Sequence, residues 1–130
     1  MTKDQFVAKA LENLFKHKIS VHFSSVNEPV PSKKKEVSTI GYFSDEEKIL
    51  FCKIDKRDEY WFEVFIHEYC HFLQYLDRAY TNTSYWADLD SWLLNKNKRL
   101  SKKRLNRCIE VIQNCELDCE KRAVSLVKKH

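Results

Sequence analysis

The chain has 130 residues, of which 43% are hydrophobic and 32% are charged, and its formal net charge at pH 7 is +4. Because this length supports one hydrophobic core, we expect residues 1–130 to form a single domain. No apolar run approaches the roughly 20 residues of a membrane span, and the first residues lack the apolar segment of a cleaved secretion signal, so we expect neither a membrane partner nor secretion.

The glycines and cysteines of the chain argue against nucleotide binding and against an oxidising compartment. The sequence contains one glycine, Gly41, whereas phosphate-binding loops and dinucleotide-binding motifs need several glycines for close backbone approach to phosphate. The five cysteines are an odd number, and three of them fall on one predicted helix instead of joining distant loops. We therefore expect no nucleotide-driven chemistry and a place in the reducing cytoplasm of the producing or host cell.

Hydrophobic periodicity predicts one helix and a small sheet in the first half of the chain. Apolar residues at helical spacing favour a helix over 4–17, and alternation of apolar and polar residues favours a strand over 18–26. The proline- and lysine-containing stretch 27–36 is typical of a loop. Strands are predicted over 37–43 and 48–54, joined by a polar turn, so this half should contain a small antiparallel sheet.

The second half of the chain is predicted to be helical. A dense run of apolar residues predicts a helix over about 58–79 that is apolar around most of its circumference and therefore buried. A polar connection at 80–85 leads to a short helix over about 87–94, and a long helix follows over about 101–128. We expect an α+β domain in which the sheet and the last helix enclose the buried helix.

The buried helix carries the HExxH motif His67-Glu68-Tyr69-Cys70-His71. Residues four apart lie on one face of a helix, so both imidazoles can bind one metal ion while Glu68 reaches a water on that metal. Bound Zn²⁺ lowers the pKa of its water toward about 7, and a neighbouring carboxylate can accept the proton. The motif predicts a zinc-dependent hydrolase with Glu68 as its general base.

The last predicted helix offers a third zinc ligand. Its apolar stripe consists of Leu105, Ile109, Ile112, Cys119, Ala123 and Val127. By helical periodicity Glu116 falls in the middle of this stripe, where a carboxylate needs a partner, and we expect it to complete the zinc site with His67 and His71. Glu120, one turn further on, is expected to accept a hydrogen bond from the outer nitrogen of a ligand histidine, or to replace Glu116 as the ligand.

The HExxH motif, with Glu116 and then Cys119 and Glu120 on a later helix, resembles the gluzincin group of zinc metallopeptidases and their compact relatives of the ImmA/IrrE type. In those families a glutamate ligand is followed three residues later by a small residue and four residues later by an acidic or amide residue. The resemblance implies a minimal zincin-like α+β core and hydrolysis of peptide bonds in a protein or peptide substrate. It also implies an edge strand before the motif helix that aligns the substrate, here Lys48–Ile54.

Two cysteines allow a different zinc site. Cys115 and Cys119 also lie four apart on one helix. Together with His67 and His71 they would form a closed Cys2His2 site that is purely structural. Such a site would leave Glu68 buried without a role, and Cys115 falls at the edge of the apolar stripe. This alternative predicts a zinc-stabilised binding module and no catalysis.

A basic segment at 96–107 introduces nucleic acid as a second candidate partner. The segment contains seven cations and no acid: Lys96, Lys98, Arg99, Lys102, Lys103, Arg104 and Arg107. Clustered cations can bind phosphates, so a module tethered to nucleic acid is one interpretation. A solvated loop and first helical turn is the simpler one.

Overall fold

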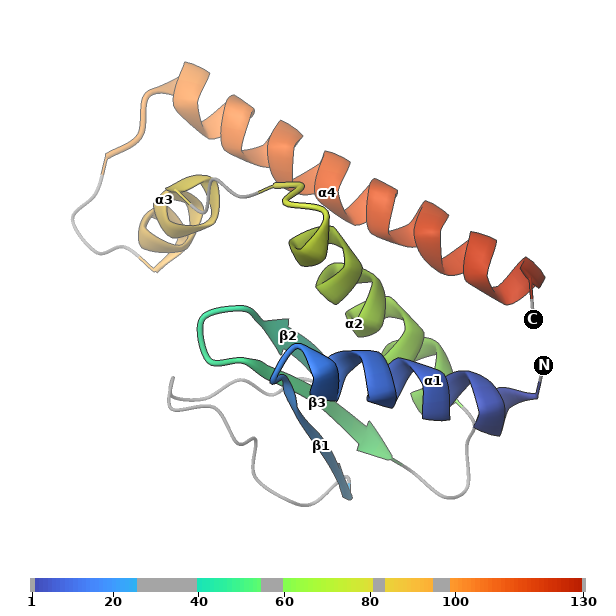
Figure 1. Ribbon diagram of the computed structural model, residues 1–130. Coiled ribbons are helices and arrows are strands. Elements are labelled where there is room, and N and C mark those ends of the chain that lie inside the picture. Colours follow the sequence, from blue (N-terminus) through green and yellow to red (C-terminus); the bar gives the residue numbers. More distant parts are fainter. Residues whose placement is uncertain (1, 26–39, 55–59, 81–83, 95–98, 130) are drawn as a thin grey trace.

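The structure, a computed structural model, describes residues 2–25, 40–54, 60–80, 84–94 and 99–129 (Figure 1). Its elements are α1 (Lys3–Lys16), β1 (Ser20–Ser25), β2 (Gly41–Ser44), β3 (Ile49–Ile54), α2 (Tyr60–Leu76), α3 (Ser84–Leu93) and α4 (Lys102–Lys129). The predicted α+β class is confirmed. The predicted loop 27–36 and the first residues of the predicted strand 37–43 lie outside the described residues.

α1 begins at a capping box. The Thr2 hydroxyl accepts a hydrogen bond from the backbone N–H of Gln5 at 3.2 Å, and the Gln5 side chain accepts one from the backbone N–H of Thr2 at 2.9 Å. The buried residues of the helix are Phe6, Ala10 and Leu14. Their spacing is the one on which the prediction of this helix depends.

The three strands form a mixed sheet in the order β1-β3-β2. β2 and β3 pair antiparallel, which confirms the predicted hairpin, whereas β1 runs parallel to β3. The prediction of an antiparallel sheet is therefore wrong for β1. β2 lies between β1 and β3 in sequence and runs antiparallel to β3, so it returns the chain and lets β3 run in the direction of β1. Alternation of apolar residues determines which side chains face the core, but it does not determine strand direction.

The strand order also corrects the predicted substrate strand. β3, which covers most of the predicted strand Lys48–Ile54, is the central strand of the sheet and not an edge. β2 is the edge strand next to the motif: a Cβ atom added to Gly41 would lie 2.5 Å from Val64 Cγ1 and 3.4 Å from Glu68 Cγ. Because glycine has no side chain, β2 can pass this close to α2.

α2 occupies the centre of the molecule. It contacts β2 and β3 on one side and α4 on the other (Figure 1). Phe65, Cys70 and Phe72 have no exposed surface, as expected for a helix that is apolar around most of its circumference. The HExxH motif therefore lies on a helix that other elements hold from two sides.

α4 turns part of the predicted stripe inward. Cys119 has no exposed surface and Ala123 packs against the core, whereas Ile109 and Val127 of the stripe are 38% and 57% exposed. The Glu116 side chain is 50% exposed, so its predicted place in the middle of the buried face is wrong. Cysteine is small and among the most buried residue types, which agrees with the complete burial of Cys119.

α3 is attached to the start of α4 through Arg104. The guanidinium donates from Nε to Asp88 Oδ2 at 2.9 Å and from Nη2 to Ser84 Oγ at 3.1 Å. It also lies 4.3 Å from the centroid of the Tyr85 ring. One cation of the predicted basic segment is thus engaged within the protein. No helix in the described ranges is both long enough and apolar enough to cross a membrane.

Candidate metal centre

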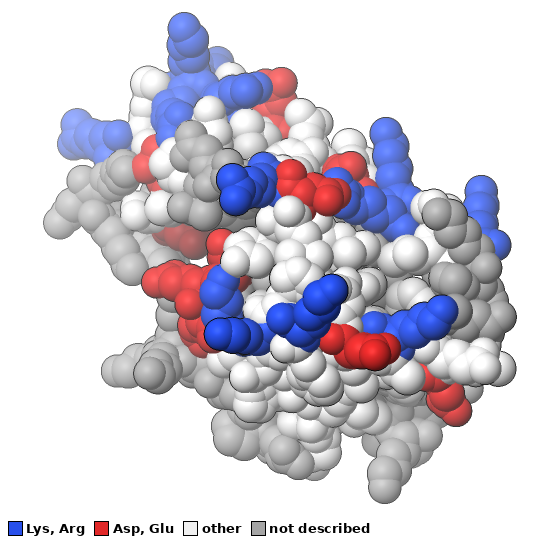
Figure 2. Space-filling view, in the orientation of Figure 1, with Lys and Arg blue, Asp and Glu red and all other residues white. Residues whose placement is uncertain are grey.

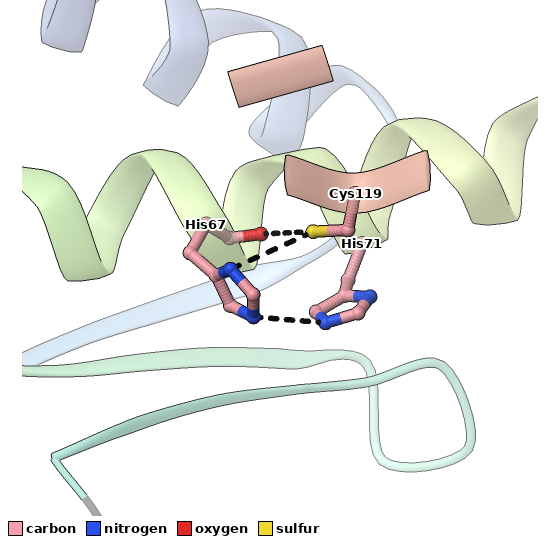
Figure 3. Close-up of side chains that lie close together, drawn as sticks. All are labelled: His67, His71 and Cys119. Carbon is pink, nitrogen blue, oxygen red and sulfur yellow. Dashed lines mark hydrogen bonds between the residues drawn. The ribbon is translucent and has the colours of Figure 1, made fainter. Parts of the chain in front are cut away.

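The two histidines of the motif point toward each other from one face of α2. Their Nε2 atoms are 3.2 Å apart, and the two rings are nearly perpendicular (Figure 3). The spacing of four residues in a helix brings the rings together, as the motif predicts. Two ring nitrogens at this distance leave a common point at which a cation could contact both.

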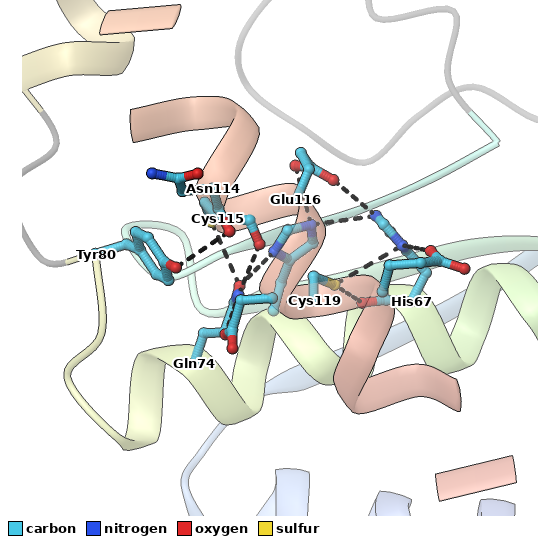
Figure 4. Close-up of polar contacts among 10 residues, drawn as sticks. His67, Gln74, Tyr80, Asn114, Cys115, Glu116 and Cys119 are labelled. Carbon is cyan, nitrogen blue, oxygen red and sulfur yellow. Dashed lines mark hydrogen bonds and ion pairs between the residues drawn. The ribbon is translucent and has the colours of Figure 1, made fainter. Parts of the chain in front are cut away.

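Glu116 reaches the same point from α4. Its Oε2 lies 3.3 Å from His67 Nε2, and its Oε1 lies 3.4 Å from His71 Nε2 (Figure 4). Zinc binds nitrogen and oxygen at about 2.0–2.1 Å, which in a tetrahedron separates the ligand atoms by about 3.3 Å. The structure therefore brings together the three residues that the sequence predicts as ligands, with a different carboxylate oxygen of Glu116 facing each histidine nitrogen.

Cys119 lies on the other side of the His67 ring. Its Sγ is 3.7 Å from His67 Nδ1 and 3.2 Å from the His67 backbone oxygen. His67, His71 and Cys119 form a group that could hold a metal ion, with donor atoms within 4.8 Å of one another. A hydrogen bond from Cys70 lowers the pKa of the Cys119 thiol, which favours the thiolate that a metal binds.

Cys115 lies beside Gln74 and close to His71. It is buried, and its Sγ donates to Gln74 Oε1 at 3.5 Å. The group of described residues that could hold a metal contains Cys119 but not Cys115. That group therefore contains one sulfur, whereas the Cys2His2 alternative needs two.

Gln74 belongs to this cluster, although no motif in the sequence predicts it. It is only 3% exposed, and its Oε1 lies 2.8 Å from His71 Nδ1. Its Nε2 donates to the Cys115 backbone oxygen at 2.9 Å and to Asp118 Oδ2 at 2.8 Å (Figure 4). A polar residue three positions after His71 on an apolar helix is the sequence signal that could have identified it.

Glu120 has a looser connection to the site. Its Oε2 lies 3.9 Å from His67 Nδ1, which is an ion-pair contact but longer than a hydrogen bond. The side chain is 67% exposed, more than that of Glu116. Of the two glutamates that the sequence offers as ligand, Glu116 is the one whose oxygens approach the histidine Nε2 atoms.

Glu68 is a buried acid at the wall of a groove. The residue is 9% exposed and lines the groove together with His71 and Glu116. Burial raises the pKa of its carboxyl from 4.5 to about 7. A carboxyl group that titrates near neutrality can accept a proton and return it at physiological pH.

The groove has a volume of about 1200 Å³ and is strongly acidic. It lies between β2 with its following turn, α2, α3 and the middle of α4. Among the described residues, one arginine, Arg78, lines it against six acids: Asp45, Glu46, Glu47, Glu68, Asp90 and Glu116. Acidic side chains gather on the side of the molecule where the β2–β3 turn lies, and basic ones gather over the start of α4 (Figure 2).

The charges within the cluster favour a bound cation. Hydrogen bonds to His67 and His71 hold the pKa of Glu116 well below its usual range. Hydrogen bonds to Cys119 and then to Glu116 raise the pKa of His67 to about 10. Protons on the histidines therefore balance the carboxylate when no metal is bound, and a metal ion can take their place because its ligands bind in the deprotonated form.

Comparison with known proteins yields no relative: no protein-family model, no curated protein and no solved structure matches the chain. A function must therefore be argued from the residues of the site.

Proposed function

We propose that this protein is a zinc-dependent hydrolase of peptide bonds, with the metal bound by His67, His71 and Glu116. The observation that carries the proposal is the approach of three side chains to one another: the two Nε2 atoms are 3.2 Å apart, Glu116 Oε2 lies 3.3 Å from His67 Nε2, and Glu116 Oε1 lies 3.4 Å from His71 Nε2. Each separation is close to the roughly 3.3 Å edge of a tetrahedral zinc site, and the two Glu116 contacts are made by different oxygens. The resemblance of the HExxH motif and Glu116 to the zincin metallopeptidases supports the same reaction class.

Glu68 is the general base in this proposal. When bound, zinc supplies Lewis acidity toward water and toward a carbonyl oxygen. The Glu68 carboxylate takes a proton from the attacking water and later passes it to the leaving amine. Its position between the histidines in sequence and beside the groove in space gives it access to both the metal and the substrate.

The substrate is proposed to lie along β2. This edge strand and its turn supply Tyr42–Glu47 to the groove wall, and its first residue approaches Glu68. An extended peptide can align with a strand at the edge of a sheet through backbone hydrogen bonds, with side chains in the groove. A peptide in this place would pass its scissile bond near Glu68.

Replacement of Glu68 by Gln tests the catalytic assignment. We expect Glu68→Gln to keep its zinc, since the three ligands are unchanged, and to lose peptide hydrolysis, because the amide cannot accept the proton. Metal content and the cleavage of a mixed peptide library would both be measured. Glu63→Gln, an exposed change on the same helix, is the matched control and should behave as the unmodified protein. Equal cleavage by the Glu68→Gln variant would refute the assignment.

A metal-stabilised binding module is the second candidate function. The observation that favours it is the group of His67, His71 and Cys119, which could also hold a metal ion. In this case the site stabilises the contact between α2 and α4, and Glu68 has no catalytic role. A metal-loaded protein that binds a peptide without cleaving it, and whose binding is unaffected by Glu68→Gln, would support this candidate.

A further inference from the structure

Gln74 links His71 to a chain of polar side chains that runs away from the metal centre. On one side its Oε1 contacts His71 Nδ1 at 2.8 Å. On the other side its Nε2 donates to Asp118 Oδ2 at 2.8 Å, and Arg122 Nε donates to the same oxygen at 2.9 Å. Arg122 also donates to Asp77 at 2.6 Å. The chain connects the end of α2 with α4 through a buried amide.

The partners of the Gln74 amide determine its orientation. A backbone carbonyl oxygen, that of Cys115, and a carboxylate oxygen, that of Asp118, both accept hydrogen bonds and cannot donate them. The NH₂ end of the amide must therefore face these two groups, and Oε1 must face His71. If the amide were reversed, the buried Cys115 oxygen would face an oxygen and lose this hydrogen bond, at a cost of about 1–3 kcal/mol, and the partly exposed Asp118 carboxylate would face a second oxygen.

The orientation of the amide in turn determines which nitrogen of His71 carries hydrogen. Gln74 Oε1 can only accept, so His71 Nδ1 must donate to it. In a neutral imidazole with hydrogen on Nδ1, the lone pair is on Nε2. His71 Nε2 is the atom that lies beside His67 Nε2 and Glu116 Oε1. The amide thus selects the tautomer whose lone pair points at the proposed metal position.

We propose that Gln74 is a positioning residue for metal binding, and that Asp118 and Arg122 hold its carboxamide in the orientation that makes His71 Nε2 a ligand. This inference rests on the proposed metal site, but it is independent of whether the protein hydrolyses peptides. Hydrogen-bond partners of this kind typically contribute about 10- to 100-fold to metal affinity, which a zinc titration can reveal.

The test must separate this role from a structural one, because Gln74 also joins α2 to the backbone of α4. Tyr80 provides the matched control: its hydroxyl donates to the Asn114 backbone oxygen at 3.1 Å, next to the Cys115 oxygen that Gln74 contacts. Tyr80→Phe removes a bond to the α4 backbone and does not touch His71. Gln74→Met keeps the size of the side chain but removes both the acceptor and the donor.

Zinc affinity is measured by competition with a chromophoric chelator, and thermal stability is measured on the metal-free proteins. We expect Gln74→Met to lower zinc affinity about 10- to 100-fold and Tyr80→Phe to leave it unchanged.

The zinc affinities of these variants either support or overturn the positioning role of Gln74. Loss of affinity in Gln74→Met without loss in Tyr80→Phe supports the positioning role. Zinc binding by Gln74→Met that equals the unmodified protein overturns it while leaving the proposed metal site intact. Parallel losses in Gln74→Met and Tyr80→Phe also overturn it, because they would reflect helix packing alone. If the unmodified protein binds no zinc, both this inference and the proposed function fail.

Discussion

Glu116 and Glu120 are one turn apart on α4. At the scale of single residues, a comparison of zinc affinity between variants at these two positions tests most directly which glutamate is the metal ligand. Glu116 contacts both histidine Nε2 atoms, whereas Glu120 lies 3.9 Å from His67 Nδ1. We expect Glu116→Gln to lower zinc affinity by more than the roughly 10- to 100-fold that loss of a ligand's hydrogen-bond partner costs. The matched change Glu120→Gln should cost less, and chelator competition measures both. A larger loss in Glu120→Gln would make Glu120 the ligand.

Helical spacing was sufficient to predict which residues of the motif come together, because residues four apart on a helix meet wherever the helix is packed. It could place Gln74 beside His71, but it could not reveal the contacts of Gln74 with Cys115 and Asp118, which lie 41 and 44 residues further along the chain. The same limit applies to Cys119: its burial follows from its type, but its approach to His67 depends on how α4 is turned.

At the scale of elements, the close contact of β2 with α2 makes a prediction about Gly41. Substitution of Gly41 by Ala would place a Cβ atom 2.5 Å from Val64 Cγ1, so the Val64 side chain or the strand must shift. Overpacking of this kind typically costs about 1–3 kcal/mol of unfolding free energy. Denaturant unfolding of the metal-free protein measures the effect, with Ser20→Ala on exposed β1 as the control that should change stability by less than about 0.5 kcal/mol. A fully stable Gly41→Ala protein would contradict the observed spacing.

The elements themselves were predictable to different degrees. The helix at 58–79 and the long last helix are clear in sequence because their periodic patterns are long, and the structure has them as α2 and α4. The direction of β1 was not predictable, since alternation is the same for parallel and antiparallel strands. The predicted inward face of α4 is correct for Cys119 and Ala123, which are buried or pack against the core, and wrong for Ile109 and Val127, which remain exposed.

At the scale of the whole molecule, the distribution of charge predicts a preference among substrates. The chain has a net charge of +4, yet the described part of the groove is lined by six acids and one arginine. A groove lined by one sign of charge attracts the opposite sign, so peptides with Lys or Arg beside the cleaved bond should be hydrolysed faster than peptides with Glu or Asp there. Matched peptide pairs at low and high salt would measure kcat/KM, and the preference should shrink as salt rises. A preference for acidic peptides would contradict this prediction.

A nucleic-acid partner for the basic segment 96–107 remains a prediction. Of its cations, Arg104 binds Asp88 and Arg107 pairs with Glu110 at 3.3 Å, so part of its charge is balanced within the protein. Residues 96–98 lie outside the described residues. A salt-dependent shift of short DNA or RNA in a binding assay would test this partner directly.

The proposed metal site consists of one zinc ion bound by two histidines and a carboxylate. X-ray absorption spectroscopy with metal analysis, on protein purified without added zinc, tests it most directly. We expect one zinc per chain, bound by nitrogen and oxygen at about 2.0–2.1 Å and by no sulfur, and we expect the same ligand shell in Cys119→Ala. A sulfur ligand at about 2.3 Å that disappears in Cys119→Ala, or protein that binds no zinc, would contradict it.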